Sequence, residues 1–166
     1  MVLKGKVHKF GDNINTDYII SGKYKFKTLD MVELAKHLME DIEPDFYKKV
    51  KKGDFIVAGR NFGCGSSREQ APLVIKYAGI PAVVAKSFAR IFYRNGINNG
   101  LILLEGDTDK IEDGDEIEIY LEEGKIKNIT KNIEIYVTKT PEFLIKIIKE
   151  GGIIDYLKKY KNFDIG

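Results

Sequence analysis

Apolar residues follow two kinds of pattern along this chain. Between residues 54 and 104 they form short continuous runs at 54–58, 82–85 and 101–104. Such runs are typical of strands that are covered on both faces. Between the runs, apolar residues recur at helical spacing, as at Ala71, Val74, Ile75 and Ala78. An alternation of strands and helices predicts parallel units packed around a sheet.

The remaining segments alternate apolar and polar residues or have helical periodicity. Residues 3–10 are expected to form a first strand. Strict alternation at 116–121, 125–129 and 132–137 predicts a small antiparallel sheet with one wet face. Helices are expected at 28–39, 43–50, 68–78, 87–95 and from 140 to 160, the last broken at its double glycine. The predicted fold class is α/β, with a mostly parallel central sheet, helices and a small antiparallel portion.

Length and composition narrow the class of protein. A chain of 166 residues is expected to form one domain, 1–166. A hydrophobic content of 43% and a charged content of 31% are ordinary for a soluble protein, and a net charge of +2 favours no polyanionic partner. Neither a membrane-length apolar run nor a signal-peptide core is present, so we expect a cytoplasmic protein.

The chain has few side chains that bind metals. Its one cysteine, Cys64, excludes an internal disulfide and cannot ligate an iron–sulfur cluster alone. Neither His8 nor His37 has a neighbouring metal-binding side chain at a spacing in the sequence that is typical of a metal site. We therefore expect this chain to bind no metal by itself.

The densest chemical motif is the stretch 59–72, which lies between an apolar run and a helical pattern. Gly63 and Gly65 permit backbone angles and close approaches that a Cβ would prevent. Ser66, Ser67 and Arg68 follow at the start of the predicted helix, where free N–H groups favour an anion. A guanidinium matches a carboxylate with two parallel hydrogen bonds. The motif predicts a carboxylate- or phosphate-binding turn.

The two serines also have a structural interpretation. Ser66 with Glu69, and Ser67 with Gln70, both fit a helix-capping box. One serine is expected to cap the helix, although the pattern does not decide which, and the other is left over. Arg68 lies at the wrong end of a helix for a cation, which favours a functional role.

Two segments before the motif are candidates to complete the site. Asp17 ends a polar turn cluster, and it is either a turn residue or the carboxylate that orients Arg68. The basic and aromatic stretch 21–28 is either a solvated connection or a flap over the anion site.

Four motifs together resemble a known family. They are Gly11-Asp12-Asn13-x-x-Thr16-Asp17-x-Ile19, the turn at 63–72, the segment 87–95 and Asn98-Asn99-Gly100. In this order they resemble the small subunits of the isopropylmalate isomerase and homoaconitase group, related to the swivelling C-terminal domain of aconitase. The resemblance runs from Gly5 to about Tyr160.

The resemblance implies a swivelling β/β/α domain that docks on a separate large subunit carrying a [4Fe–4S] cluster. The implied reaction removes water from a hydroxy acid and adds it back at the neighbouring carbon. By resemblance Ser66 is the catalytic base, and Ser67 and Arg68 hold a substrate carboxylate with Asp17 nearby. A carboxylate-binding module without chemistry remains an alternative. A serine hydrolase is disfavoured, because neither histidine lies in a triad context.

In this family the loop Tyr24-Lys25-Phe26-Lys27-Thr28 corresponds to the part that discriminates substrates. Homoaconitase-like members tend to have Tyr-Leu-Arg-Thr, so Phe26 stands in the place of the arginine. An aromatic ring there suits an isopropyl group, which favours isopropylmalate. Lys25 and Lys27 keep the homoaconitase alternative open, since a lysine can pair with an extra carboxylate.

The loop gives a first testable prediction. Replacing Phe26→Arg should introduce turnover of a tricarboxylate, because the new guanidinium would pair with the additional carboxylate. Substrate profiling of the complex with its large subunit, wild type beside variant, measures this. An unchanged profile would contradict the assignment of the loop.

Overall fold

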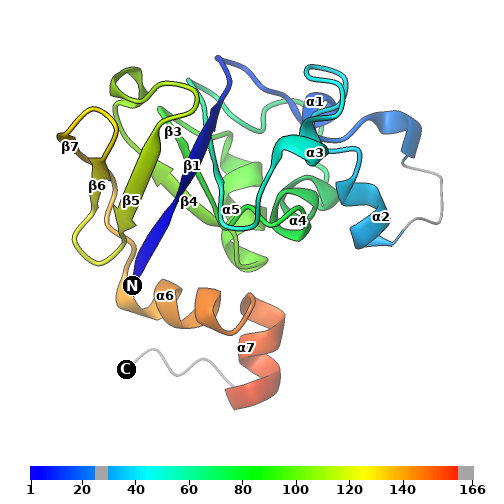
Figure 1. The fold of residues 1–166 in the computed structure, drawn as a ribbon. Helices are drawn as coiled ribbons and strands as arrows, with labels where there is room; N and C mark the ends of the chain where they lie inside the picture. The colour runs from blue at the N-terminus through cyan, green and yellow to red at the C-terminus, as the bar shows by residue number, and fades with distance from the viewer. Residues whose placement is uncertain (25–29, 161–166) are drawn as a thin grey trace.

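The structure, a computed structural model, describes residues 1–24 and 30–160. Seven strands form one mixed sheet in the order β4-β3-β2-β1-β5-β6-β7 (Figure 1). Three neighbouring pairs of strands are parallel and three are antiparallel. This confirms the α/β class, but the antiparallel part of the sheet is as large as the parallel part and not the small portion that was predicted. The strands are β1 (Val2–Lys9), β2 (Phe55–Val57), β3 (Ala82–Ala85), β4 (Ile102–Glu105), β5 (Glu116–Tyr120), β6 (Lys125–Asn128) and β7 (Ile133–Tyr136).

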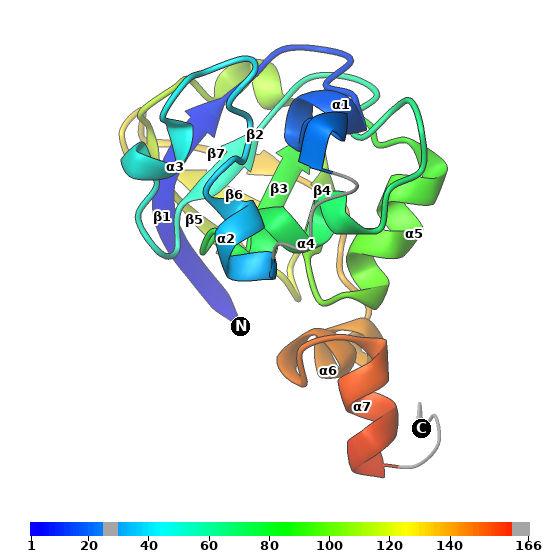
Figure 2. The same ribbon diagram turned by 90° about the vertical axis from the view of Figure 1, so that its right-hand side faces the viewer.

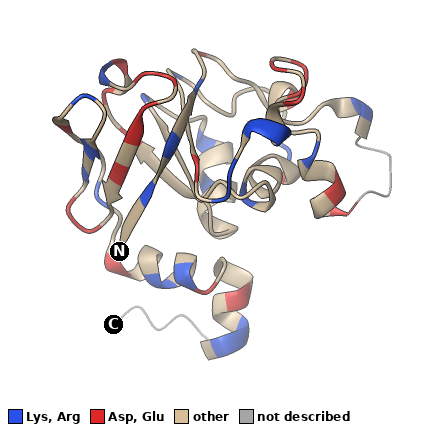
Figure 3. Ribbon diagram, viewed as in Figure 1, with Lys and Arg blue, Asp and Glu red and all other residues tan. Residues whose placement is uncertain are grey.

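Strand β1 joins the two halves of the sheet. Its first five residues pair antiparallel with β5, and residues 7–9 pair parallel with β2. Lys4 lies opposite Glu118 and Lys6 opposite Glu116 in this register. Figure 3 shows segments coloured for Lys and Arg on β1 beside segments coloured for Asp and Glu on β5. Cross-strand pairs of this kind stabilise one register.

The sheet curls until its two edges approach each other. Gly106, just after β4, forms an isolated bridge with Val137, just after β7. The Glu105 N–H donates to the Thr138 hydroxyl at 3.1 Å, and the Thr138 N–H donates to the Glu105 carbonyl at 3.0 Å. The curled sheet encloses an apolar core that includes Val57, Val84 and Ile117, and α6 adds Ile145 and Ile148 to it.

Helices cover the sheet in two groups. Figures 1 and 2 show α1, α2, α4 and α5 together beside the parallel strands, whereas α6 and α7 lie apart at one end. The helices are α1 (Thr16–Ile19), α2 (Met31–Ala35), α3 (Phe46–Lys49), α4 (Gln70–Tyr77), α5 (Arg90–Asn98), α6 (Glu142–Lys149) and α7 (Ile153–Tyr160), with short 3₁₀ turns at Gly22–Tyr24 and Thr108–Lys110. No helix in the described part of the chain has the length and apolar character needed to cross a bilayer.

The parallel strands are buried on both faces, as their continuous apolar runs predicted. Ile56, Val83 and Ala85 face the helices, whereas Val57 and Val84 face the interior of the curled sheet. All four residues of β3 are fully buried. The sheet therefore separates two hydrophobic cores.

The helix boundaries differ from the prediction, most clearly at α2 and α5. The helix expected to continue to residue 39 ends at Ala35, because the chain turns at Met39, whose φ is +57° and whose N–H donates to the Ile19 carbonyl at 3.0 Å. Helix α5 begins at Arg90 after Ala89, and its start has no side-chain cap. The Ser87 hydroxyl accepts the Asn61 N–H at 2.8 Å instead.

An aromatic cluster supports the carboxyl edge of the parallel strands. Phe62 is fully buried, and its ring packs edge-on against Phe92 at a centroid distance of 5.3 Å and against Phe88 at 6.0 Å.

The substitution Phe62→Ala should lower the free energy of unfolding by about 3–5 kcal/mol, since a large cavity remains. Urea denaturation measures this. Tyr136→Ala, at a side chain 76% exposed, is the control and should change stability by less than about 0.5 kcal/mol.

Candidate functional site

The loops that follow β1, β2 and β3 meet at the carboxyl edge of the parallel strands. Main-chain hydrogen bonds join them: the Gly63 N–H donates to the Ile14 carbonyl at 2.7 Å, and the Thr16 N–H donates to the Cys64 carbonyl at 2.9 Å. Phe62 in turn exchanges hydrogen bonds with Ser87 and Ala89 in the third loop. Ligands of open α/β sheets bind at this edge.

The turn itself requires glycine at two positions. Gly63 has a φ of +83°, and a Cβ on it would overlap the Phe92 ring. Gly65 has a φ of +88°, and a Cβ on it would lie 3.3 Å from the Asn15 Cβ. The expected need for positive φ and close approach is confirmed, and it places the following serines at the surface.

The prediction that a serine caps the following helix is wrong. The N-cap of α4 is Glu69, which makes no side-chain capping bond, so Ser66 and Ser67 lie before the cap in the loop. Both serines are exposed, and within residues 1–24 and 30–160 neither hydroxyl has a hydrogen-bond partner. The Thr16 hydroxyl donates to the Ser66 carbonyl at 2.6 Å, which holds the Ser66 backbone in place.

Arg68 is oriented by the loop after β1. Its Nη2 lies 2.5 Å from Asp17 Oδ1, and its Nη1 donates to the Ile20 carbonyl at 3.4 Å. The expected Asp17–Arg68 pair is therefore confirmed. The Arg68 side chain is 18% exposed, and a Cβ on Gly22 would come within 3.1 Å of Nη2. A guanidinium has five N–H donors, so donors remain for a ligand.

Two hollows lie on either side of Ser67 and Arg68. The larger, about 470 Å³, is also lined by Ser66 and Tyr24. The smaller, about 230 Å³, is also lined by Thr16, Gly63, Gly65, Ala89, Arg90, Ile91, Phe92 and Asn95. Of the candidate site residues from the sequence, Tyr24, Ser66, Ser67 and Arg68 line the larger hollow, and Asp17 forms an ion pair with Arg68. Lys25, Phe26, Lys27 and Thr28 lie outside the described residues.

Arg90 is a site residue that the sequence did not single out. It is exposed in the first turn of α5, it lines the smaller hollow, and in the described part of the chain it has no ion pair or hydrogen bond. The sequence could have indicated Arg90, because a cation in the first turn of a helix is electrostatically unfavourable. The same argument singled out Arg68 at the start of its predicted helix.

The histidines pair with carboxylates. His8 Nε2 lies 2.8 Å from Asp54 Oδ2 in a buried pair, and His37 Nδ1 lies 2.8 Å from Glu40 Oε2. Among the residues that the structure describes, no group of three or more His, Cys, Asp or Glu side chains could hold a metal ion. Cys64 is a half-buried free thiol.

Comparison with known proteins identifies the family to which this fold and its site belong. A model of the aconitase C-terminal domain matches residues 9–109, and the chain belongs to that family. Several of its curated relatives are named 3-isopropylmalate dehydratase small subunits. One from Archaeoglobus fulgidus is 56% identical over 165 residues, covering 99% of this chain and all of the relative. Another, from Halothermothrix orenii, is 59% identical over 160 residues, covering 95% and 96%.

A solved structure has the same fold. The crystal structure of a 3-isopropylmalate dehydratase from Methanocaldococcus jannaschii is 55% identical and superposes with a TM-score of 0.92, covering 97% of this chain and 96% of that one. The resemblance inferred from the four motifs is thus confirmed over the full length of the chain.

The contact between Thr16 and Ser66 gives a prediction. Thr16→Val keeps the shape of this buried side chain but removes the donor to the Ser66 carbonyl, and it should cost about 1–2 kcal/mol in unfolding free energy. Amide hydrogen exchange should accelerate at 64–67 and stay unchanged in β6. Thr16→Ser retains the hydroxyl and is the control; equal exchange in both variants would contradict the role of this bond.

Proposed function

We propose that this chain is the small subunit of a 3-isopropylmalate dehydratase, a hydro-lyase that interconverts 2-isopropylmalate and 3-isopropylmalate in leucine biosynthesis. The observation that carries the proposal is the arrangement of two exposed serine hydroxyls beside an oriented guanidinium at the mouth of one hollow. This arrangement offers a base and a carboxylate clamp, and the names of full-length relatives supply the substrate class.

The reaction requires a proton to leave a carbon that is next to a carboxylate. Ser66, as an alkoxide, is the base: its hydroxyl is exposed, and no described side chain competes for it. The Thr16 hydrogen bond fixes the backbone that carries it. In the reverse direction the Ser66 hydroxyl returns the proton to the same carbon when water is added.

Arg68 and Ser67 hold a substrate carboxylate. Asp17 fixes one edge of the guanidinium, so the side chain is preorganised and little rotamer freedom is lost on binding. The Asp17 carboxylate also offsets much of the Arg68 charge. A dicarboxylate therefore needs a further cation, and Arg90 on the far side of Ser67 supplies one for the second carboxylate.

The site is incomplete in this chain alone. Both serines face solvent, so the described part of the chain does not exclude water from them. A single cysteine does not fit an iron–sulfur cluster, so the [4Fe–4S] cluster that supplies Lewis-acid chemistry belongs to a large subunit. The chain alone is then inactive, and docking of the large subunit closes the hollows.

The experiment is reconstitution with a cluster-bearing large subunit, followed by hydration of isopropylmaleate and citraconate. Ser66→Ala should lower kcat by about 10²–10⁴-fold, because general-base catalysis contributes that much. Arg68→Ala should act mainly on KM and lower kcat/KM by about 10²-fold or more, since the guanidinium that holds the substrate carboxylate is lost.

Lys48→Ala, at a surface ion pair far from the motif, is the control and should behave as wild type. Activity that survives both site substitutions undiminished would refute the assignment of the site. A complex that hydrates homoaconitate but not isopropylmaleate would instead favour the homoaconitase alternative.

A further inference from the structure

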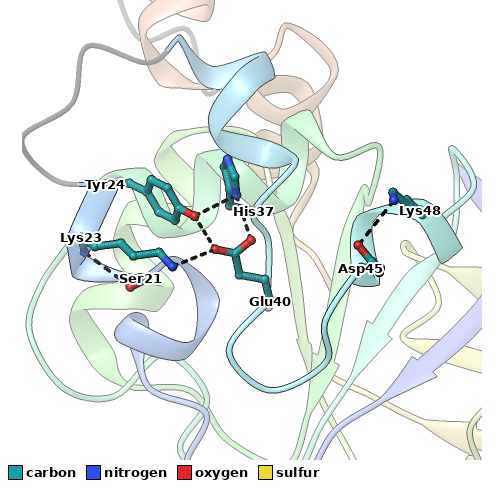
Figure 4. A network of polar contacts seen from close by, with 7 residues as sticks. All are labelled: Ser21, Lys23, Tyr24, His37, Glu40, Asp45 and Lys48. Carbon is teal, nitrogen blue, oxygen red and sulfur yellow. Dashed lines mark hydrogen bonds and ion pairs between the residues drawn. The ribbon is translucent and has the colours of Figure 1, made fainter.

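Tyr24 is anchored by two residues beyond the site. Figure 4 shows its phenol pointing toward Glu40 and His37. The Tyr24 hydroxyl donates to Glu40 Oε1 and lies 3.0 Å from His37 Nδ1. The Tyr24 and His37 rings are also stacked, with centroids 4.2 Å apart. Lys23 completes the cluster, with its Nζ 3.6 Å from Glu40 Oε1.

Glu40 is the acceptor on which this cluster depends. As a carboxylate it accepts from the Tyr24 hydroxyl and from His37 Nδ1, and it forms an ion pair with the Lys23 ammonium. Burial opposes its charge, but the hydrogen bonds from Tyr24 and His37 outweigh this and lower the pKa of Glu40. Burial and the bond to Glu40 raise the pKa of Tyr24. Near neutral pH Glu40 is therefore ionised and the Tyr24 phenol keeps its proton.

The anchored hydroxyl decides what Tyr24 presents to the larger hollow. Because that hydroxyl is engaged by Glu40 and His37, the ring contributes carbon surface there. The other apolar residues around the same hollow are Ile20, Met31, Leu34 and Leu73. Ser66, Ser67 and Arg68 lie on its polar side. One hollow thus joins an apolar wall to a carboxylate clamp.

We infer that Glu40 and His37 are positioning residues that hold the Tyr24 ring as the apolar wall for the branched alkyl group of the substrate. The inference rests on the proposed function and deepens it. An alkyl group prefers an apolar wall, whereas a free phenol hydroxyl turned into the hollow would favour water or a polar substituent. The cluster therefore acts on substrate choice and leaves the proton transfer at Ser66 unaffected.

The test compares hydration of isopropylmaleate and citraconate by the reconstituted complex, because these acids differ only in the alkyl group. Glu40→Ala should lower the ratio of their kcat/KM values by about tenfold, mainly through the KM of isopropylmaleate. Tyr24→Phe, which keeps the ring but loses the anchor, should lower it similarly. The double variant should be no worse than either single variant, since both break one interaction.

Two comparisons separate positioning from general stability. Glu40→Gln retains an acceptor and should restore part of the ratio. Glu33→Ala breaks the exposed ion pair between α2 and Lys36, which follows it, and should leave the ratio at the wild-type value. Both kcat/KM values are measured on the same preparation of each variant. A lower yield of folded protein therefore lowers both values equally and does not change their ratio.

The outcomes distinguish this inference from the proposed function. An active complex whose ratio is unchanged by Glu40→Ala and by Tyr24→Phe overturns the inference alone. A wild-type complex that hydrates neither acid overturns the proposed function, and the inference with it.

Discussion

The main-chain hydrogen bonds between the loops after β1 and β2 are the constraint on which the site depends. They run from Gly63 to Ile14 and from Thr16 to Cys64, so two segments that are about fifty residues apart in the chain behave as one unit. Backbone pairs of this kind need glycine where the loops approach most closely. Once the loops are joined, Asp17 meets Arg68 without further adjustment.

The rest of the fold keeps that junction rigid. Strand β1 belongs to both halves of the sheet, and so the loop that follows it is anchored to two hydrophobic cores. The aromatic cluster around Phe62 fills the space below the turn. A rigid scaffold beneath exposed polar loops is the usual division between stability and function. Here it leaves both serines exposed at the surface.

Chemical roles separate in space around Arg68. The side with Arg90 is cationic, whereas the side with Tyr24, Met31 and Leu34 is apolar. A substrate with carboxylates at one end and a branched alkyl group at the other matches this division. Segments coloured for Lys and Arg and for Asp and Glu are interspersed along the described elements in Figure 3.

The sequence alone determined the parallel strands and the glycine turn, because continuous apolar runs and positive-φ requirements are local signals. For Asp17 it left a turn residue and a partner of Arg68 as alternatives, and only the structure decided for the ion pair. The sequence also predicted a serine cap that does not form. The pattern could not show that both serines belong to the loop and that the helix begins only after Glu69. Only the tertiary structure placed Arg90 beside the motif and brought Glu40 and His37 to the Tyr24 hydroxyl. These contacts depend on how the chain turns at Met39 and on how the loops dock, and such long-range packing has no periodic signature.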